Sequence, residues 1–304
     1  MSKQGLLQLM QLVINKIEFI IERIPETLRY TFSKEKVMLN VSMKVENGKV
    51  AHQNLGDELN YYFVKAATNK TIFNRPCTLI RTSENFMMIG SIIEDLINRN
   101  SVIWGSGAMY GGDMKLPSKP KKVLAVRGPL TREYLLSQGV DCPEVYGDPA
   151  LLLPYFYAPQ VVKKYKLGVI PHYVDFENEC LSELKRDCEV KVIQLSGYED
   201  WRQVIDEICQ CKFVVSSSLH GLIISDAYGI PNKWIKLSEN INGGYFKYHD
   251  YFLSVGREKS EPLIINEKVS KDYLLEYKSQ YIPINWSPEK LLEVAPFKFV
   301  HLSK

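Results

Sequence analysis

Hydrophobic residues recur at steps of three and four along residues 5–28, at Leu6, Met10, Val13, Ile17, Ile20, Ile24 and Leu28. This spacing predicts one amphipathic helix. We expect its apolar side to pack on the protein's own core, with a dimer interface or shallow contact with a membrane surface as alternatives. Membrane contact ranks last, because the polar side mixes Lys16 with Glu18 and Glu22, whereas surface-seeking helices are usually richer in basic residues.

After this helix, short apolar runs alternate with segments of helical spacing. The predicted strands are 37–41, 86–89, 102–104, 123–126, 167–170, 190–195, 213–215 and 234–237. The predicted helices are 57–67, 92–97, 129–138, 177–187, 198–210, 220–228, 246–254 and 288–294. Strands that alternate with helices in this way predict the doubly wound α/β class, with parallel sheets covered by helices.

The stretch Pro154–Tyr165, which is rich in proline and tyrosine, interrupts this alternation and is the best linker candidate. We therefore expect two doubly wound Rossmann-like domains facing a cleft, residues 1–157 and residues 158–304. The length of 304 residues fits two domains of about 150 residues each. The last residues form a tail that we expect to pack back on the first domain.

Composition narrows the function classes. The net charge of +3 is too small to indicate a nucleic-acid partner. The six cysteines include no CxxC pair, and we see no cluster with metal-ligand spacing. We expect no disulfides, no signal peptide and no membrane-spanning segment, and hence a cytoplasmic protein.

The most informative stretch is Ser216–Pro231, which predicts a strand end, a polar loop and a helix. The first backbone N–H groups of a helix are unpaired and carry the positive end of its dipole, so they can hold an anion. Ser217, Ser218, Leu219, His220 and Gly221 lie at this helix start and are candidate anion-binding residues, with His220 also a candidate for proton transfer. The alternative is purely local, with His220 capping the loop and the serines satisfying a turn.

Other polar groups follow predicted strands in the same way. Asn54, Gly56 and Asp57 lead into a helix, and Ser106 and Gly107 form a turn that permits close backbone approach to a ligand. Arg127 follows a strand, where its guanidinium could grip a phosphate or carboxylate or form a surface salt bridge. Asp148 is well placed to cap a short helix at Pro149, which is also its simplest role.

Seven pieces along residues 54–256 together resemble one family, the polysaccharide pyruvyltransferases. The pieces are Asn54-Leu55-Gly56-Asp57, Trp104-Gly105-Ser106-Gly107, Val126-Arg127-Gly128-Pro129, Gly147-Asp148-Pro149-Ala150, Ser216 to Gly221, Gly229-Ile230-Pro231 and Phe246-Lys247-Tyr248-His249-Asp250-Tyr251. The helix end Asp226–Pro231 is also similar to the donor-site helix of GT-B glycosyltransferases. The resemblance implies a GT-B-like fold.

The resemblance also implies an activity. Such an enzyme transfers the enolpyruvyl unit of phosphoenolpyruvate to two hydroxyls of a sugar, giving a cyclic ketal and phosphate without a metal or cofactor. The family shows Arg-Leu-His-Gly where this chain has Ser218-Leu219-His220-Gly221, so Lys236 or Lys247 would supply the second positive charge beside Arg127.

Within this implied reaction we expect His220 as general acid, and Asp57 and Asp148 as groups that activate the sugar hydroxyls. Asn54, Gly56, Ser106 and Gly107 would face the acceptor. The acceptor would be a polysaccharide or lipid-linked repeat unit. If it is lipid-linked, the amphipathic N-terminus could hold the enzyme at the inner face of the membrane, and homo-oligomers are compatible with this reaction. Two other classes stay open: a GT-B glycosyltransferase that uses a nucleotide sugar, and a non-catalytic binding module.

Overall fold

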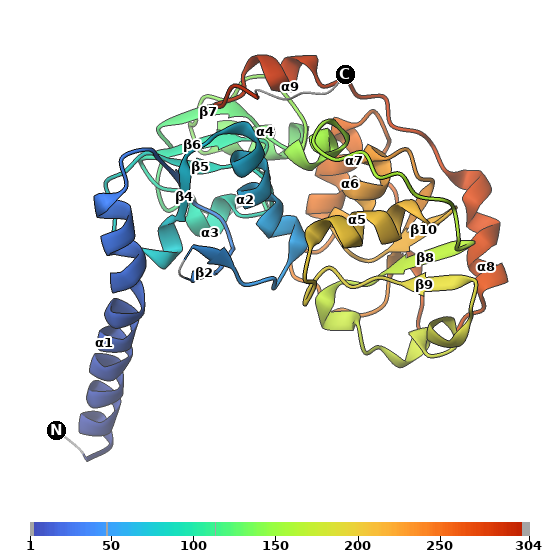
Figure 1. The fold of residues 1–304 in the computed structure, drawn as a ribbon, viewed down its shortest axis with the longest axis horizontal. Helices are drawn as coiled ribbons and strands as arrows, with labels where there is room; N and C mark the ends of the chain where they lie inside the picture. Colours follow the sequence, from blue (N-terminus) through green and yellow to red (C-terminus); the bar gives the residue numbers. More distant parts are fainter. Residues whose placement is uncertain (1–2, 47, 113, 300–304) are drawn as a thin grey trace.

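The predicted alternation of strands and helices is present in the computed structural model, which describes residues 3–46, 48–112 and 114–299 (Figure 1). The α-helices are α1 (Lys3–Phe32), α2 (Leu55–Ala67), α3 (Ile93–Leu96), α4 (Pro129–Ser137), α5 (Trp201–Cys209), α6 (Leu219–Ala227), α7 (Phe246–Ser254), α8 (Lys271–Leu275) and α9 (Glu289–Glu293). The 3-10 helices are η1 (Arg75–Cys77), η2 (Pro149–Tyr155), η3 (Tyr173–Asp175), η4 (Glu179–Leu181), η5 (Leu184–Arg186) and η6 (Glu276–Gln280).

Two parallel sheets of five strands form the centre of the molecule. The first has the order β4-β1-β5-β6-β7, with β1 (Lys36–Leu39), β4 (Thr71–Asn74), β5 (Asn85–Met87), β6 (Ser101–Trp104) and β7 (Lys122–Ala125). The second has the order β12-β11-β10-β8-β9, with β8 (Leu167–Ile170), β9 (Val190–Val192), β10 (Val214–Ser216), β11 (Asn232–Lys236) and β12 (Leu263–Ile264). The apolar runs form strands because both faces of a parallel sheet are covered, and the two-domain Rossmann-like prediction is confirmed.

Four short strands escaped the sequence pattern: β4, β12 and the antiparallel pair β2 (Val45–Glu46) and β3 (Lys49–Val50). One predicted helix was wrong, because residues 177–187 form the separate turns η4 and η5. The Asn178 side chain accepts a hydrogen bond from the backbone N–H of Cys180 at 2.9 Å. Such local side-chain bonds compete with a continuous helix.

The expectation that the N-terminal helix packs on its own core was also wrong. In Figure 1, α1 extends away from the first sheet, and only its C-terminal part contacts the body. Its apolar residues from Leu6 to Leu28 are exposed, with Ile17 50% exposed. The sequence gives the correct helix but not its surroundings, because periodicity indicates an apolar side without saying what covers it.

The two halves meet at a buried ion pair. Arg127, at the end of β7, donates from Nε to Oδ2 of Asp250 on α7 over 2.9 Å, and both side chains are fully buried. Asp250 also accepts hydrogen bonds from the backbone N–H and the hydroxyl of Thr131, on α4. This network fixes α7 against the first half of the chain.

A second joint is made by backbone hydrogen bonds. Leu55 N–H donates to Leu195 O over 2.7 Å, and Gly197 N–H donates to His52 O over 2.7 Å. The C-terminal segment also packs on the first sheet, where Trp104 Nε1 donates to Leu291 O over 2.9 Å. The halves are therefore held together at several points. The exact domain boundary stays a prediction.

We expect Asp250→Asn to lower the free energy of unfolding by about 3–5 kcal/mol, because it leaves the Arg127 guanidinium buried without a counter-charge. Urea denaturation followed by circular dichroism measures the loss. Glu144→Gln is the matched control, since Glu144 pairs with Arg132 but is 72% exposed, and its loss should stay within about 1 kcal/mol. Equal losses in the two variants would contradict the structural role of the buried pair.

Candidate functional site

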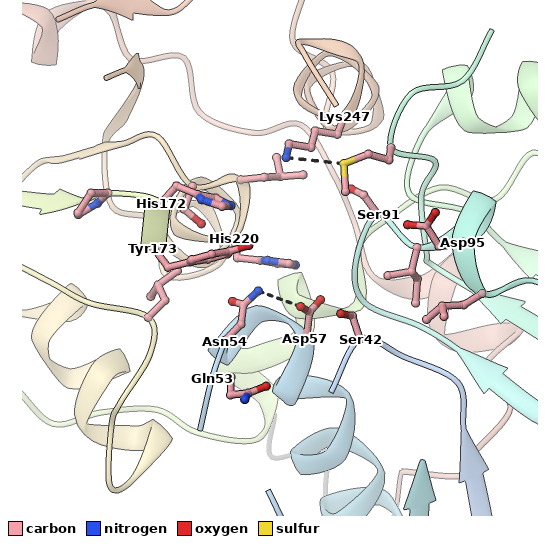
Figure 2. Close-up of a pocket in the computed structure, with 17 residues that line it drawn as sticks. Ser42, Gln53, Asn54, Asp57, Ser91, Asp95, His172, Tyr173, His220 and Lys247 are labelled. Carbon is pink, nitrogen blue, oxygen red and sulfur yellow. Dashed lines mark hydrogen bonds between the residues drawn. The ribbon is translucent and has the colours of Figure 1, made fainter. Parts of the chain in front are cut away.

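A cavity of about 240 Å³ lies between the two sheets, at the carboxyl ends of their strands (Figure 2). The first half of the chain contributes polar side chains to its wall, namely Ser42, Gln53, Asn54, Asp57, Ser91 and Asp95. The second half contributes His172, Tyr173, Ser218, Leu219, His220 and Lys247. Parallel α/β sheets bind ligands at this edge, so the location agrees with the sequence expectation.

Two helix N-termini from opposite halves meet at this cavity. Gly56 lies in the first turn of α2 and His220 in the first turn of α6. A methyl group placed on Gly56 would lie only 1.9 Å from Nδ1 of His220, so the imidazole packs directly on the glycine backbone. The Gly56 and His220 motifs, 164 residues apart in the sequence, are therefore one structural unit, and glycine is needed at position 56 for this contact.

The carboxyl group of Asp57, on α2, faces the cavity and has a raised pKa. Burial raises the pKa of its carboxyl to about 7, although a hydrogen bond from Asn54 and the charge of Lys247 act in the opposite direction. Asn54 Nδ2 donates to Oδ2 of Asp57 over 2.8 Å, while Asn54 Oδ1 caps α2. At neutral pH, Asp57 is thus partly protonated and can either donate or accept a proton.

His220 is uncharged in this environment. Burial, and then the charges of Arg127, Lys247 and His172, lower the pKa of its imidazole to about 3. Its Nε2 is buried and has no hydrogen-bond partner among the described residues. Buried polar atoms normally have partners, so the unpaired nitrogen is consistent with a ligand site.

Lys247 supplies a positive charge across the cavity from Asp57 (Figure 2). It projects from α7, where Nζ donates to Asn242 O over 2.9 Å. Burial lowers the pKa of its ammonium group to about 8, with help from the charge of Arg127. The amine is still mostly protonated at neutral pH, and an anion beside it would relieve the cost of its desolvation.

The serine-rich loop before α6 is held mainly by hydrogen bonds to the backbone. Ser216 Oγ donates to Ile170 O, and the Ser217 hydroxyl accepts from the backbone N–H of His172. Ser218 lines the cavity, whereas Gly221 packs inward against Ser216 and Ile170. The helix ends at Gly229, whose φ of 63° requires glycine, as the sequence predicts.

Several predicted site residues lie away from the cavity wall. The Arg127 guanidinium donates hydrogen bonds to Asp250, Ser91 and the Ala108 carbonyl, and Gly107 packs against it. Its donor-binding role stays a prediction. Ser106 is buried beside this cluster, its hydroxyl unpaired within the described residues.

Asp148 and Lys236 also lie outside the cavity wall. Asp148 caps η2 by accepting from the Ala150 N–H over 2.9 Å. Lys236 pairs with Glu239 beside Tyr245. Neither residue therefore contacts the space that His220, Asp57 and Lys247 share.

The cavity also includes residues to which the sequence reasoning assigned no role. Ser42, Ser91 and His172 follow β1, β5 and β8, so their positions after strands were the available signal. Burial lowers the pKa of His172 to about 4, with Lys247 contributing. Gln53, Asp95 on α3 and Tyr173 on η3 had no comparable signal, because only the tertiary fold brings them to the cavity.

A second cavity of about 580 Å³ adjoins the first at the base of α1. Ser42, Gln53 and Leu96 line both cavities. Its remaining wall includes Glu22, Arg23 and Glu26 from α1. Two adjoining spaces can hold two substrates.

Within residues 3–46, 48–112 and 114–299, no group of three His, Cys, Asp or Glu residues is arranged to hold a metal ion. None of the helices in that part of the chain has the length and apolarity to cross a membrane. All six cysteines are free.

These features define a two-domain, Rossmann-like α/β protein with a polar site between its halves. A family model for polysaccharide pyruvyl transferases matches residues 79–237, and the chain belongs to this family. It is 29% identical over 215 residues to an uncharacterized protein of Acanthamoeba polyphaga mimivirus, covering 68% of this chain and 73% of that protein.

The chain is also similar to the succinoglycan biosynthesis protein ExoV of Rhizobium meliloti (strain 1021), with 28% identity over 213 residues. That match covers 67% of this chain and 62% of ExoV. A crystal structure of a functionally uncharacterized protein from Klebsiella pneumoniae aligns with 88% of this chain and all of that one. Its TM-score is 0.42 and its sequence identity is 13%.

The buried carboxyl of Asp148 predicts a distinctive pH dependence. Desolvation raises its pKa from 3.8 to about 7. The folded state is therefore penalised when this group ionises; the penalty is absent below about pH 4 and complete above about pH 7. We expect the stability of Asp148→Asn, relative to wild type, to increase as the pH rises through this range, as measured by urea unfolding at several pH values.

Asp200→Asn is the control, because Asp200 also caps a helix but its pKa is lowered, chiefly by a hydrogen bond from Arg202. The stability that Asp200 provides is complete above its unfolded pKa of about 3.8 and is lost as the pH falls below it. Its variant should therefore show a constant deficit between about pH 4.5 and 7.5. A constant offset for Asp148→Asn as well would contradict the raised pKa.

Proposed function

We propose that this protein is a pyruvyltransferase that moves the enolpyruvyl group of phosphoenolpyruvate to a sugar of a polysaccharide or lipid-linked repeat unit. Membership of the family supports the reaction class, and the similarity to ExoV, a succinoglycan biosynthesis protein, supports a polysaccharide acceptor. The proposal rests on His220, at the start of α6. Its Nε2 is buried without a hydrogen-bond partner among the described residues, in the cavity that Lys247 also lines. We also propose that the facing domains have the GT-B arrangement.

The donor would bind between α6 and α7. Phosphoenolpyruvate carries a phosphate and a carboxylate, which need cations and N–H donors. Lys247 provides the cation and the start of α6 provides backbone donors with the positive end of the dipole. Lys247 would thereby supply the positive charge that the family arginine provides at the position of Ser218. The buried Arg127 would add a second positive charge near the site.

The reaction needs one proton delivered and two removed. A proton added to the methylene carbon makes the adjacent carbon electrophilic, and a sugar hydroxyl attacks it. Phosphate then leaves as the carbon–oxygen bond breaks, and the second hydroxyl closes the ketal. The products are the cyclic ketal and one phosphate, and one of the two hydroxyl protons leaves with the phosphate. No step uses a metal or cofactor.

The site chemistry favours different proton roles from those expected from the sequence. His220 was expected as the general acid, but with its pKa lowered to about 3 the imidazole is neutral at pH 7, and its one N–H is a weak acid. Asp57, with a pKa of about 7, retains a carboxyl proton. We therefore assign proton delivery to Asp57 and proton removal from the acceptor to His220, whose basicity a bound anionic donor would raise.

The acceptor would approach from the first half of the chain. The second cavity is large enough for a sugar unit and shares Ser42 and Gln53 with the first. Asn54 and Gly56 lie at this side of the site.

The strongest alternative is a glycosyltransferase that uses a nucleotide sugar. The cavity beside His220 and Lys247 measures about 240 Å³, which is small for a nucleotide sugar but suits a donor of the size of phosphoenolpyruvate.

The test is phosphate release from phosphoenolpyruvate in the presence of aryl galactosides, mannosides and N-acetylhexosamines. We expect acceptor-dependent release by the wild type and a loss of about 10²–10⁴-fold in His220→Ala. Lys247→Met should mainly raise the KM for phosphoenolpyruvate, because its charge binds the donor. His249→Ala is the control and should retain activity, since His249 lies on α7 but does not line the cavity.

If no phosphate is released, thermal shift measurements distinguish a wrong donor from an unsuitable acceptor panel. Stabilisation by phosphoenolpyruvate without turnover would support the donor and place the error in the acceptor panel. Stabilisation by UDP or GDP but not by phosphoenolpyruvate would overturn the proposal in favour of a glycosyltransferase.

A further inference from the structure

The body of the protein holds α1 by its polar side. Arg23 Nε donates to Pro76 O over 2.8 Å, and Glu26 Oε1 accepts from the Gly48 N–H over 3.0 Å. Arg29 Nη2 donates to Ile72 O over 3.2 Å. Because these residues lie opposite the apolar side in helical projection, the apolar side faces away from the body.

The apolar side follows a seven-residue repeat. The positions Leu6, Met10, Val13, Ile17, Ile20 and Ile24 alternate steps of four and three, as do the core positions of a coiled coil, and all six side chains are exposed. Leu7, Ile14 and Ile21 widen the stripe at seven-residue intervals. The opposite side carries Gln8, Asn15 and Glu22 at the same interval. This pattern extends over nearly three heptads.

The exposed apolar area of α1 is larger than a monomer usually leaves in contact with water. Fourteen large apolar side chains of α1 are exposed, most of them by about half. Together they present on the order of 1,000 Å², against roughly 300–600 Å² for the largest apolar patch on a typical monomer. A specific protein interface covers about 800 Å² per partner, so this one helix offers sufficient surface.

The charged residues of α1 help to decide whether its apolar side binds a membrane or another helix. Helices that lie on anionic membranes carry lysine and arginine on their polar side. Along the part of α1 that projects from the body, the side opposite the apolar stripe carries Gln4, Gln8, Gln11, Asn15, Glu18 and Glu22, with Lys16 at its border. The two arginines on this side, Arg23 and Arg29, are bonded to the body. The repeat of seven, in contrast, is what a matching helix requires.

We infer that the apolar side of α1 binds the same helix of another copy of this chain, forming a coiled-coil bundle. Isoleucine at both kinds of core position, as at Ile17, Ile20 and Ile24, favours three or four helices over two. The bundle excludes the stripe from water and leaves the polar side attached to the body. This inference is independent of the proposed reaction.

The test is the solution mass of the full chain, measured by sedimentation velocity and light scattering at about 10 µM. The wild type should exceed the monomer mass of 35.0 kDa by an integer factor. Ile17→Glu with Ile24→Glu should dissociate to monomers, with a dissociation constant weakened at least about 100-fold, because two charges enter the core of the bundle. The matched control Asn15→Glu adds a charge to the polar side of α1 and should keep the oligomer.

Three outcomes would overturn the inference: a monomeric wild type, an oligomer that persists in the double variant, or a monomer that floats with phosphatidylcholine vesicles through α1. Unfolding curves of the double variant and the control confirm that the body remains folded, as expected for substitutions at exposed positions.

Discussion

The buried pair of Arg127 and Asp250 is the interaction on which the site depends. It joins the end of β7 to α7, and α7 carries Lys247 into the cleft. A buried ion pair is weak evidence for added stability, because desolvation of both groups offsets much of their attraction. The pair instead fixes the position of α7. The Arg127 guanidinium bonds to Asp250, Ser91 and Ala108, so α7 has one position against the first half of the chain.

The site itself is assembled from both halves under opposing electrostatic effects. Burial raises the pKa of Asp57 and lowers those of His220, His172 and Lys247. Each shift favours the uncharged form of its group, as expected where desolvation by burial is the largest cause. A bound anion would oppose the shifts of the bases, and its binding would then be coupled to proton uptake.

Local patterns predicted most of the fold and the outline of the site. Apolar runs and helical spacing identified both sheets, and polar residues after strands marked Asn54, Asp57 and His220. The missed break in segment 177–187 reflects local side-chain bonds, such as the one from the Cys180 N–H to Asn178. The other differences concern tertiary surroundings, because the exposed side of α1 and the buried partners of Arg127 depend on neighbours distant in the sequence. Gln53 and Tyr173 enter the cavity for the same reason, without any local signal.

The backbone bonds between Leu55 and Leu195 and between His52 and Gly197 cross the cleft beside the site. A hinge between the halves would have to break these main-chain hydrogen bonds, together with the buried pair at α7. Separation of the two walls would therefore cost these hydrogen bonds and the ion pair, which favours a cleft of fixed width. The entropy lost in bringing the two walls together is then incurred during folding and not when a ligand binds.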